Sequence, residues 1–201
     1  MSGKILNVMN VDIFRVRNNK VLEEVKNMLG LEYGMDYSEE SNRAKLRYGG
    51  IMIMADADDD GKHIVGLVIN YFYCCFPQLI QIGFVMFYRS PIIRAWRIKN
   101  GKEVDKQKFF NTGEYEKWEK EQGSLTGWHF MYIKGLGTND DAGIFEDSKD
   151  PRYVQCMYDN QTSQAMTLAF SKDLANMRKE WLVKWKNRPE LELPPRQPVT
   201  N

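Results

Sequence analysis

The fold of this 201-residue chain is decided by the stretch Ile51-Met52-Ile53-Met54-Ala55-Asp56-Ala57-Asp58-Asp59-Asp60-Gly61-Lys62. Its first half is a continuous apolar run, and a run bounded by turn residues predicts a buried strand of the parallel kind. The apolar residues that follow predict a helix over residues 62–76, which ends near Pro77. Strand, loop and helix in this order open a βαβ unit. The stretch therefore predicts an α/β fold with a small, mostly parallel sheet flanked by helices.

The loop between this strand and helix carries four carboxylates in five positions, from Asp56 to Asp60. Such crowding is costly unless a cation or strong donors compensate it. The loop also lies at the carboxyl end of a strand, where α/β sheets bind ligands. Because Asp56, Asp58 and Asp60 alternate, an extended loop could direct them toward one divalent ion. Hard oxygen ligands favour Mg²⁺, with Mn²⁺ or Ca²⁺ as substitutes.

Two other interpretations of the acidic loop were compared with the metal site. An EF-hand loop also begins D-x-D-x-D-G, but it needs Glu at its twelfth position, where this chain has Leu67. The segment before the loop also resembles a strand rather than a helix, so the EF-hand is excluded. A solvated acidic turn without a ligand stays open as the second interpretation.

Composition limits the class of protein. Lys and Arg number 28 and Asp and Glu number 27, so the formal net charge is +1 and any nucleic-acid surface must be local. The three cysteines are Cys74, Cys75 and Cys156. We expect the first two to be buried, reduced thiols, which favours a reducing compartment. The longest apolar run is shorter than the roughly 20 residues that span a bilayer, so no membrane partner is expected.

Further elements are predicted along the chain. A helix over residues 21–29 is expected, with Asn18 or Asn19 as its cap and Gly30 as its stop. Strands are expected at residues 84–88, 92–96 and 128–133, with a polar turn at 99–102. Thr112 could cap a helix, and Ser171 could cap a last amphipathic helix after a short apolar stretch at 168–170.

Six segments, taken in sequence order, resemble motifs of the type IIA DNA topoisomerases. They are Gly3-Lys4-Ile5-Leu6-Asn7, the strand and acidic loop from Arg47 to Ile64, Ser90-Pro91-Ile92, Lys134-Gly135-Leu136-Gly137-Thr138, Leu168-Ala169-Phe170-Ser171-Lys172 and Arg178-Lys179-Glu180-Trp181-Leu182. Each motif alone is weak, but six in order are very specific. Together with Leu31-Glu32-Tyr33-Gly34, the last two lean toward the eukaryotic or viral branch of the family.

The resemblance implies a Rossmann-like TOPRIM fold with a C-terminal helical extension. It divides the chain into an N-terminal segment (1–17), a TOPRIM domain (18–138), an extension (139–187) and a disordered tail (188–201). It also implies site roles. Metal ligands would be Asp56, Asp58 and Asp60. Supporting residues at the cleavage site would be His63 and Lys134, and contacts to the DNA backbone would come from Lys4, Asn7, Arg178 and Lys179.

The family mechanism implies double-stranded DNA as the partner. A tyrosine attacks a DNA phosphate, Mg²⁺ stabilises charge on that phosphate, and ATP drives strand passage. This chain would need a second copy or a complementary topoisomerase subunit for the tyrosine, and a missing domain for ATP. We also expect this chain to lack the family's first metal ligand, a Glu upstream of the G-K-x-L-N segment. The implied location is the nucleus or cytoplasm.

The chain departs from the family pattern at Ala57 and Asp59, where Gln is usual, and at Lys62, where Ser is usual. Three hypotheses follow. The chain could be a fragment or split subunit of a working topoisomerase, a catalytically inactive paralogue that binds DNA or a partner, or a member of another Mg²⁺-dependent TOPRIM class such as a primase or nuclease. The third has little support, because Lys134 to Thr138 and Arg178 to Leu182 match topoisomerases. The isolated chain is predicted neither to cleave DNA nor to hydrolyse ATP.

Overall fold

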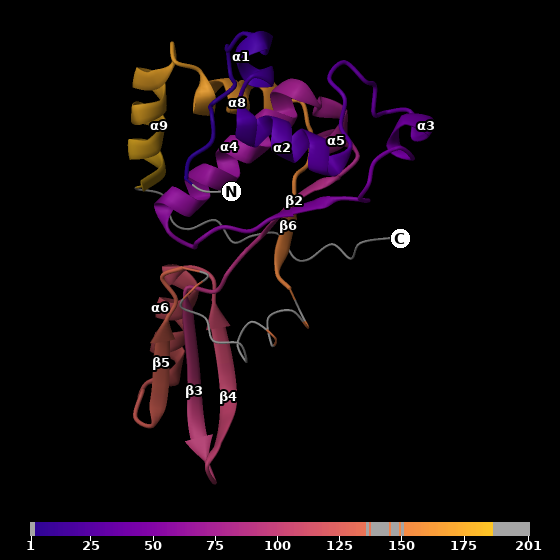
Figure 1. Cartoon of the computed structure of the whole chain (residues 1–201). Coiled ribbons are helices and arrows are strands. Elements are labelled where there is room, and N and C mark those ends of the chain that lie inside the picture. The colour runs from indigo at the N-terminus through magenta and orange to yellow at the C-terminus, as the bar shows by residue number, and fades with distance from the viewer. Residues whose placement is uncertain (1–2, 136, 138–144, 146–148, 150, 187–201) are drawn as a thin grey trace.

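The chain folds into two lobes, each built on its own three-stranded sheet (Figure 1). The structure is a computed structural model and describes residues 3–135, 137, 145, 149 and 151–186. We call residues 3–89 and 151–186 the large lobe, and residues 90–135 the small lobe. The large lobe holds most of the helices, and the small lobe extends away from it beyond the ends of β2 and β6.

The sheet of the large lobe has the strand order β1-β2-β6, where β1 is Ile51–Ile53, β2 is Val85–Tyr88 and β6 is Tyr153–Gln155. The pair β1 and β2 is parallel, and β6 runs antiparallel to β2. Helices surround this sheet: α1 (Ile13–Arg17), α2 (Lys20–Leu29), α3 (Glu40–Arg43), α4 (Asp59–Cys75), α5 (Pro77–Gln81), α8 (Thr162–Phe170) and α9 (Ala175–Lys186).

The sheet of the small lobe is antiparallel, with the order β4-β3-β5. Its strands are β3 (Ile93–Lys99), β4 (Lys102–Phe109) and β5 (Trp128–Tyr132), and helix α6 (Thr112–Gln122) packs against one face. Trp118 of α6 lies 4.8 Å from Trp128 and 5.0 Å from Phe109, measured between ring centroids. These aromatic contacts supply most of the small core.

The α/β class is confirmed, but the expectation of a mostly parallel sheet is wrong for the described strands. Among them, β1 and β2 form the one parallel pair. A parallel pair needs a long crossover connection, and α4 and α5 supply it between these two strands. Strands β3 and β4 are joined by a short turn at Asn100 and Gly101, both with positive φ, which favours antiparallel pairing.

Several local expectations are confirmed, with shifted ends. Asn19 caps α2 by accepting a hydrogen bond from Leu22 N at 3.2 Å, and Gly30 ends that helix with φ of 76°. The long helix after the acidic loop begins at Asp59 rather than at residue 62. The reason is that Asp58 Oδ1 accepts from Gly61 N at 2.7 Å and so caps the helix early.

Other expectations were wrong or incomplete. Asn111 rather than Thr112 caps α6, and Ser171 ends α8 instead of starting the last helix, which begins at Ala175. Helices α1 and α8 and strand β4 were not predicted, although residues 99–102 do form the turn before β4. The predicted disordered tail at 188–201 lies outside the described residues.

The buried apolar side chains of the described residues form two separate clusters. The larger one includes Phe76, whose ring centroid lies 5.4–6.2 Å from those of Tyr33, Tyr37, Tyr71 and Phe72. The burial predicted for Cys74 is wrong, because this residue near the end of α4 is exposed. Cys75 and Cys156 are half-buried, and all three cysteines are free.

Within the described ranges, no helix has the length and apolar character that a membrane span requires.

Gly61→Ala is expected to destabilise the protein by about 1–3 kcal/mol, the usual cost of overpacking. A methyl group on Gly61 would lie 2.8 Å from the carbonyl carbon and 2.9 Å from the nitrogen of Asp56, so backbone would have to move. Chemical denaturation measures the change. Gly66→Ala in the same helix is the matched control, because its methyl group would meet only the end of the Phe170 ring at 3.2 Å. Equal losses in the two variants would contradict the proposed backbone clash.

Candidate functional site

The acidic loop and the Lys134–Gly135 loop meet where the two lobes come together. Asp56 follows β1 of the large lobe, and Gly135 follows β5 of the small lobe. A methyl group added to Gly135 would lie 2.9 Å from Cγ and Oδ1 of Asp56 and 3.1 Å from Oδ2. The carboxylate of Asp56 therefore packs directly against the Gly135 backbone. Two motifs that are about 80 residues apart in sequence are thus brought into one place.

The other carboxylates of the loop contact nearby donors. Asp58 Oδ1 accepts from Gly61 N, as the cap of α4. Asp60 Oδ1 lies 2.9 Å from Lys4 Nζ, and Asp59 Oδ1 lies 3.2 Å from Lys62 Nζ. Acidic side chains near the first turn of a helix also interact favourably with its dipole. The crowded charges are therefore spread over separate partners.

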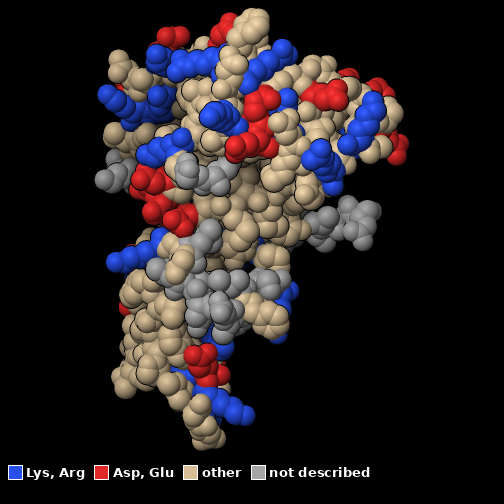
Figure 2. Space-filling model, viewed as in Figure 1, with Lys and Arg blue, Asp and Glu red and all other residues tan. Residues whose placement is uncertain are grey.

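The predicted focus of Asp56, Asp58 and Asp60 on one ion does not appear as a three-ligand group. Within residues 3–135 and the other described positions, no three His, Cys, Asp or Glu side chains are arranged to hold a metal ion. Figure 2 shows acidic and basic side chains side by side over the visible face, without a broad field of one sign. Mg²⁺ commonly binds through one or two carboxylates, with water and phosphate oxygens completing its shell. The donor set fits an ion of that kind.

The two supporting candidates both lie beside this loop in sequence or space. His63 is exposed, in the first turns of α4. Lys134 is exposed and precedes Gly135, which touches Asp56. The backbone at this point is held by Ile133 N, which donates to Ile92 O at 2.9 Å. The Lys134 side chain therefore starts from an anchored strand end close to the Asp56 carboxylate.

The four predicted DNA contacts fall into two kinds. Lys4 and Lys179 are exposed cations, although Lys4 is paired with Asp60. Asn7 is used internally, since its Nδ2 donates to Phe170 O at 2.9 Å. Arg178 is half-buried, and its Nη1 donates to Leu168 O and Ser171 O, both at 3.0 Å. These last two side chains connect α8 to its neighbours.

Asn70 is a structural residue that the sequence interpretation left without a role. It is fully buried in α4, and its Nδ2 donates to Asn7 Oδ1 at 2.9 Å. Through Asn7 it joins the N-terminal segment to the end of α8. The sequence could have indicated this role, because Asn70 is a polar residue inside an otherwise apolar helix and a buried amide requires a hydrogen-bond partner.

Comparisons with known proteins relate the chain to one family. Residues 88–200 match the family described as the C-terminal associated domain of TOPRIM. The chain is 38% identical over 187 residues to DNA topoisomerase 2 of Arabidopsis thaliana, covering 90% of the chain and 12% of that protein. It is 33% identical over 186 residues to the mitochondrial DNA topoisomerase 2 of Dictyostelium discoideum, covering 90% of the chain and 14% of that protein.

A solved structure has the same fold. It is the DNA-binding, cleavage and re-ligation domain of Plasmodium falciparum topoisomerase II, with a TM-score of 0.73 and 34% sequence identity. The match covers 90% of this chain and 24% of that one. The chain therefore spans a small part of the length of the proteins that it resembles.

Lys4→Gln is expected to raise the pKa of Asp60 toward its usual value of 3.8. The hydrogen bond and positive charge of Lys4 lower the pKa of this carboxyl below 3.8. Because the pKa of Asp60 is lower in the folded protein than in the unfolded chain, ionised Asp60 stabilises the fold at pH values above its unfolded pKa. This stabilisation is lost as the pH falls through its folded pKa. NMR titration of the side-chain carboxyl carbon measures the shift. Lys62→Gln, which removes the partner of Asp59, should leave the pKa of Asp60 nearly unchanged.

Gly135→Ala is expected to displace the Asp56 carboxylate or the loop itself, because the added methyl group has no room beside Asp56. Amide chemical shifts of residues 55–57 report this displacement. Gly137→Ala is the control in the same loop, since a methyl group there would meet no atom of the described residues within 4 Å. If both variants shift residues 55–57 alike, the contact between Gly135 and Asp56 is not what fixes the carboxylate.

Proposed function

We propose, from the premise that this chain belongs to the type II DNA topoisomerase family, that it supplies one face of the site at which such an enzyme cleaves and rejoins double-stranded DNA. The observation that carries the proposal is the contact of the Asp56 carboxylate with Gly135. It joins the acidic loop of one lobe to the Lys134 loop of the other. A carboxylate and a lysine at one junction suit chemistry on a phosphate diester.

In this proposal Asp56 is the main metal ligand, and Asp58 and Asp60 support it. Asp56 is exposed, and its carboxylate lies against the Gly135 backbone next to Lys134. A bound Mg²⁺ would stabilise negative charge on the phosphate and on the leaving oxygen. Lys134 and His63 would interact with the same phosphate from the neighbouring loop and helix. The remaining ligands would come from water, from DNA or from a partner chain.

The proposed DNA surface uses charge rather than base recognition. Lys4 and Lys179 would contact phosphates, which positions a duplex without selecting its sequence. Asn7 and Arg178 are already bonded to backbone carbonyl groups. In this proposal they hold the N-terminal segment and α8 in place, and any direct contact with DNA would be added to that role. Binding should weaken with salt.

The proposal includes partners. The proposed partners are double-stranded DNA and either a second copy of the chain or a complementary topoisomerase subunit, and the family mechanism adds an attacking tyrosine, ATP hydrolysis and strand passage. Since these activities act on chromosomal DNA, we place the protein in the nucleus, with a mitochondrial site as the alternative given by the name of one relative.

A second candidate is an inactive relative that binds DNA or a partner without a metal ion. The observation that favours it is that Asp58 caps α4, while Asp59 pairs with Lys62 and Asp60 pairs with Lys4. In that case the acidic loop would be stable and functional without Mg²⁺.

Titration with Mn²⁺, followed by calorimetry, separates the two candidates. Asp56→Asn is expected to reduce Mn²⁺ affinity at least about 10-fold, since a ligand is lost. Asp59→Asn is the matched control, because it removes the same charge from the same loop but from a fully exposed side chain paired with Lys62. Equal heats for the parent and Asp56→Asn would favour the inactive relative. A cleavage assay with an added chain that carries the family's Glu and tyrosine then tests the catalytic role.

A further inference from the structure

In the part of the chain that the structure describes, the two lobes have separate apolar cores, so other contacts must help to set their relative orientation. The two buried clusters are separate, with residues such as Phe72 and Val85 in one and Ile93 and Phe109 in the other. Pro91 is buried where the chain crosses from one lobe to the other. Lobes without a large common apolar interface are expected to move relative to each other unless specific contacts hold them.

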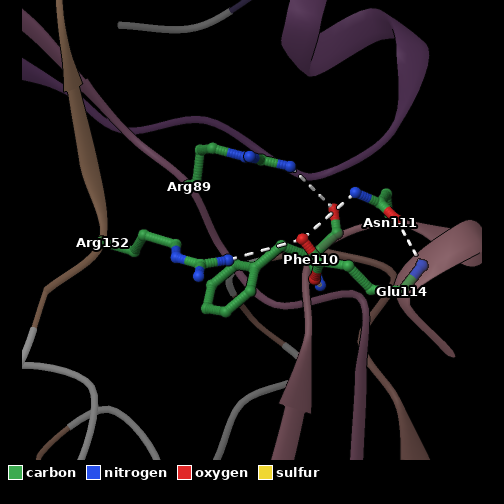
Figure 3. Close-up of polar contacts among 5 residues, drawn as sticks. All are labelled: Arg89, Phe110, Asn111, Glu114 and Arg152. Atoms are coloured by element: carbon green, nitrogen blue, oxygen red, sulfur yellow. Dashed lines mark hydrogen bonds and ion pairs between the residues drawn. The ribbon is translucent and has the colours of Figure 1, made fainter. Parts of the chain in front are cut away.

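Specific contacts of this kind occur between two arginines of the large lobe and the start of α6 in the small lobe (Figure 3). Arg89 follows β2, and its Nη2 donates to Phe110 O at 3.3 Å. Arg152 precedes β6, and its Nη1 lies 3.5 Å from Glu114 Oε1. The guanidinium carbon of Arg152 lies 4.2 Å from the centroid of the Phe110 ring, within the range of a cation–π interaction.

The two arginines are themselves joined, and the residues that they contact are held by further hydrogen bonds. Arg89 N donates to Arg152 O at 2.8 Å, so the ends of β2 and β6 act as one unit. On the small lobe, Glu114 Oε2 accepts from Phe110 N at 2.8 Å and Glu114 N donates to Asn111 Oδ1. This reciprocal arrangement at a helix start resembles a capping box. We call these contacts of Arg89 and Arg152 with Phe110 and Glu114 the arginine junction. It connects two elements that are each held by their own hydrogen bonds.

The same lobe orientation decides whether the site exists. Asp56 belongs to the large lobe and Gly135 to the small lobe, and their atoms are in contact. A small rotation of the small lobe would separate the Lys134–Gly135 loop from the Asp56 carboxylate. The arginine junction lies at the same boundary between the lobes, but it joins the ends of β2 and β6 to the start of α6.

We infer that Arg152, together with Arg89, is a positioning residue that holds the Lys134–Gly135 loop against Asp56 by fixing the small lobe through Phe110 and Glu114. The inference rests on the proposed function only for the chemical role of Asp56. The junction acts through the orientation of the small lobe. This assigns a function to Arg89 and Arg152 that lies outside the motifs of the cleavage site.

Residual dipolar couplings of backbone amides, fitted separately for each lobe, measure the orientation. In the parent chain the two lobes should share one alignment tensor. Arg152→Gln should reduce the tensor magnitude of the small lobe relative to the large lobe while the couplings within each lobe still fit its structure. Arg152→Lys retains a cation near Phe110 and Glu114 and should restore much of the loss.

Arg97→Gln is the matched control. Arg97 makes the same kinds of contact, an ion pair of 2.6 Å with Asp105 and a cation–π contact of 4.9 Å with Trp128, but entirely inside the small lobe. It should leave the two tensors equal. A shared tensor in Arg152→Gln, or an equal loss in Arg97→Gln, would overturn the inference.

Addition of Mn²⁺ gives a second readout that links the junction to the site. Paramagnetic broadening at Asp56 and Gly135 is expected in the parent, and in Arg152→Gln the broadening at Gly135 should fall relative to that at Asp56. Absence of broadening in the parent would contradict the metal role in the proposed function. The dipolar couplings would still decide the positioning role by themselves.

Discussion

The close approach of Gly61 to the backbone of Asp56 is the constraint on which the acidic loop depends. A side chain at position 61 would meet the nitrogen, carbonyl carbon and oxygen of Asp56, so only glycine allows α4 to begin where it does. Asp58 then caps that first turn. With both ends of the loop fixed, the Asp56 carboxylate leaves the end of β1 in one direction and reaches Gly135. Packing and capping thus determine the direction of the carboxylate.

Nearby donors offset much of the crowded charge of the acidic loop. Each of Asp58, Asp59 and Asp60 has a donor or a lysine, and surface pairs of this kind are individually weak. Asp59 and Lys62, two of the departures from the family pattern, form a pair across one turn of α4, so the added negative charge is compensated locally. Crowded carboxylates need either a cation or strong donors, and these contacts supply donors to Asp58, Asp59 and Asp60.

The sequence predicted local structure well where a residue type has one common structural role, such as a helix cap. Asn19 and Gly30 marked the ends of α2, and the apolar run from Ile64 marked α4. The sequence did not predict the structure where the pairing of strands decides it. Strand β4 alternates poorly, because both of its faces are largely exposed, and nothing in residues 93–99 shows that they form a sheet apart from β1 and β2. Of the candidate site, the motifs located Asp56 and Lys134, but the use of Asn7 and Arg178 as internal donors required the tertiary structure.

A junction of arginine, phenylalanine and carboxylate has a different physical character from a shared apolar core. A core interface would hold the lobes in one packing, whereas directional contacts of partly exposed groups can release and reform with little cost in buried apolar area. Arg152 and Glu114 are each more than a third exposed, so water competes for them. The proposed function places the acidic loop and the Lys134–Gly135 loop on different lobes, so their contact depends on these directional groups and not on a common apolar core.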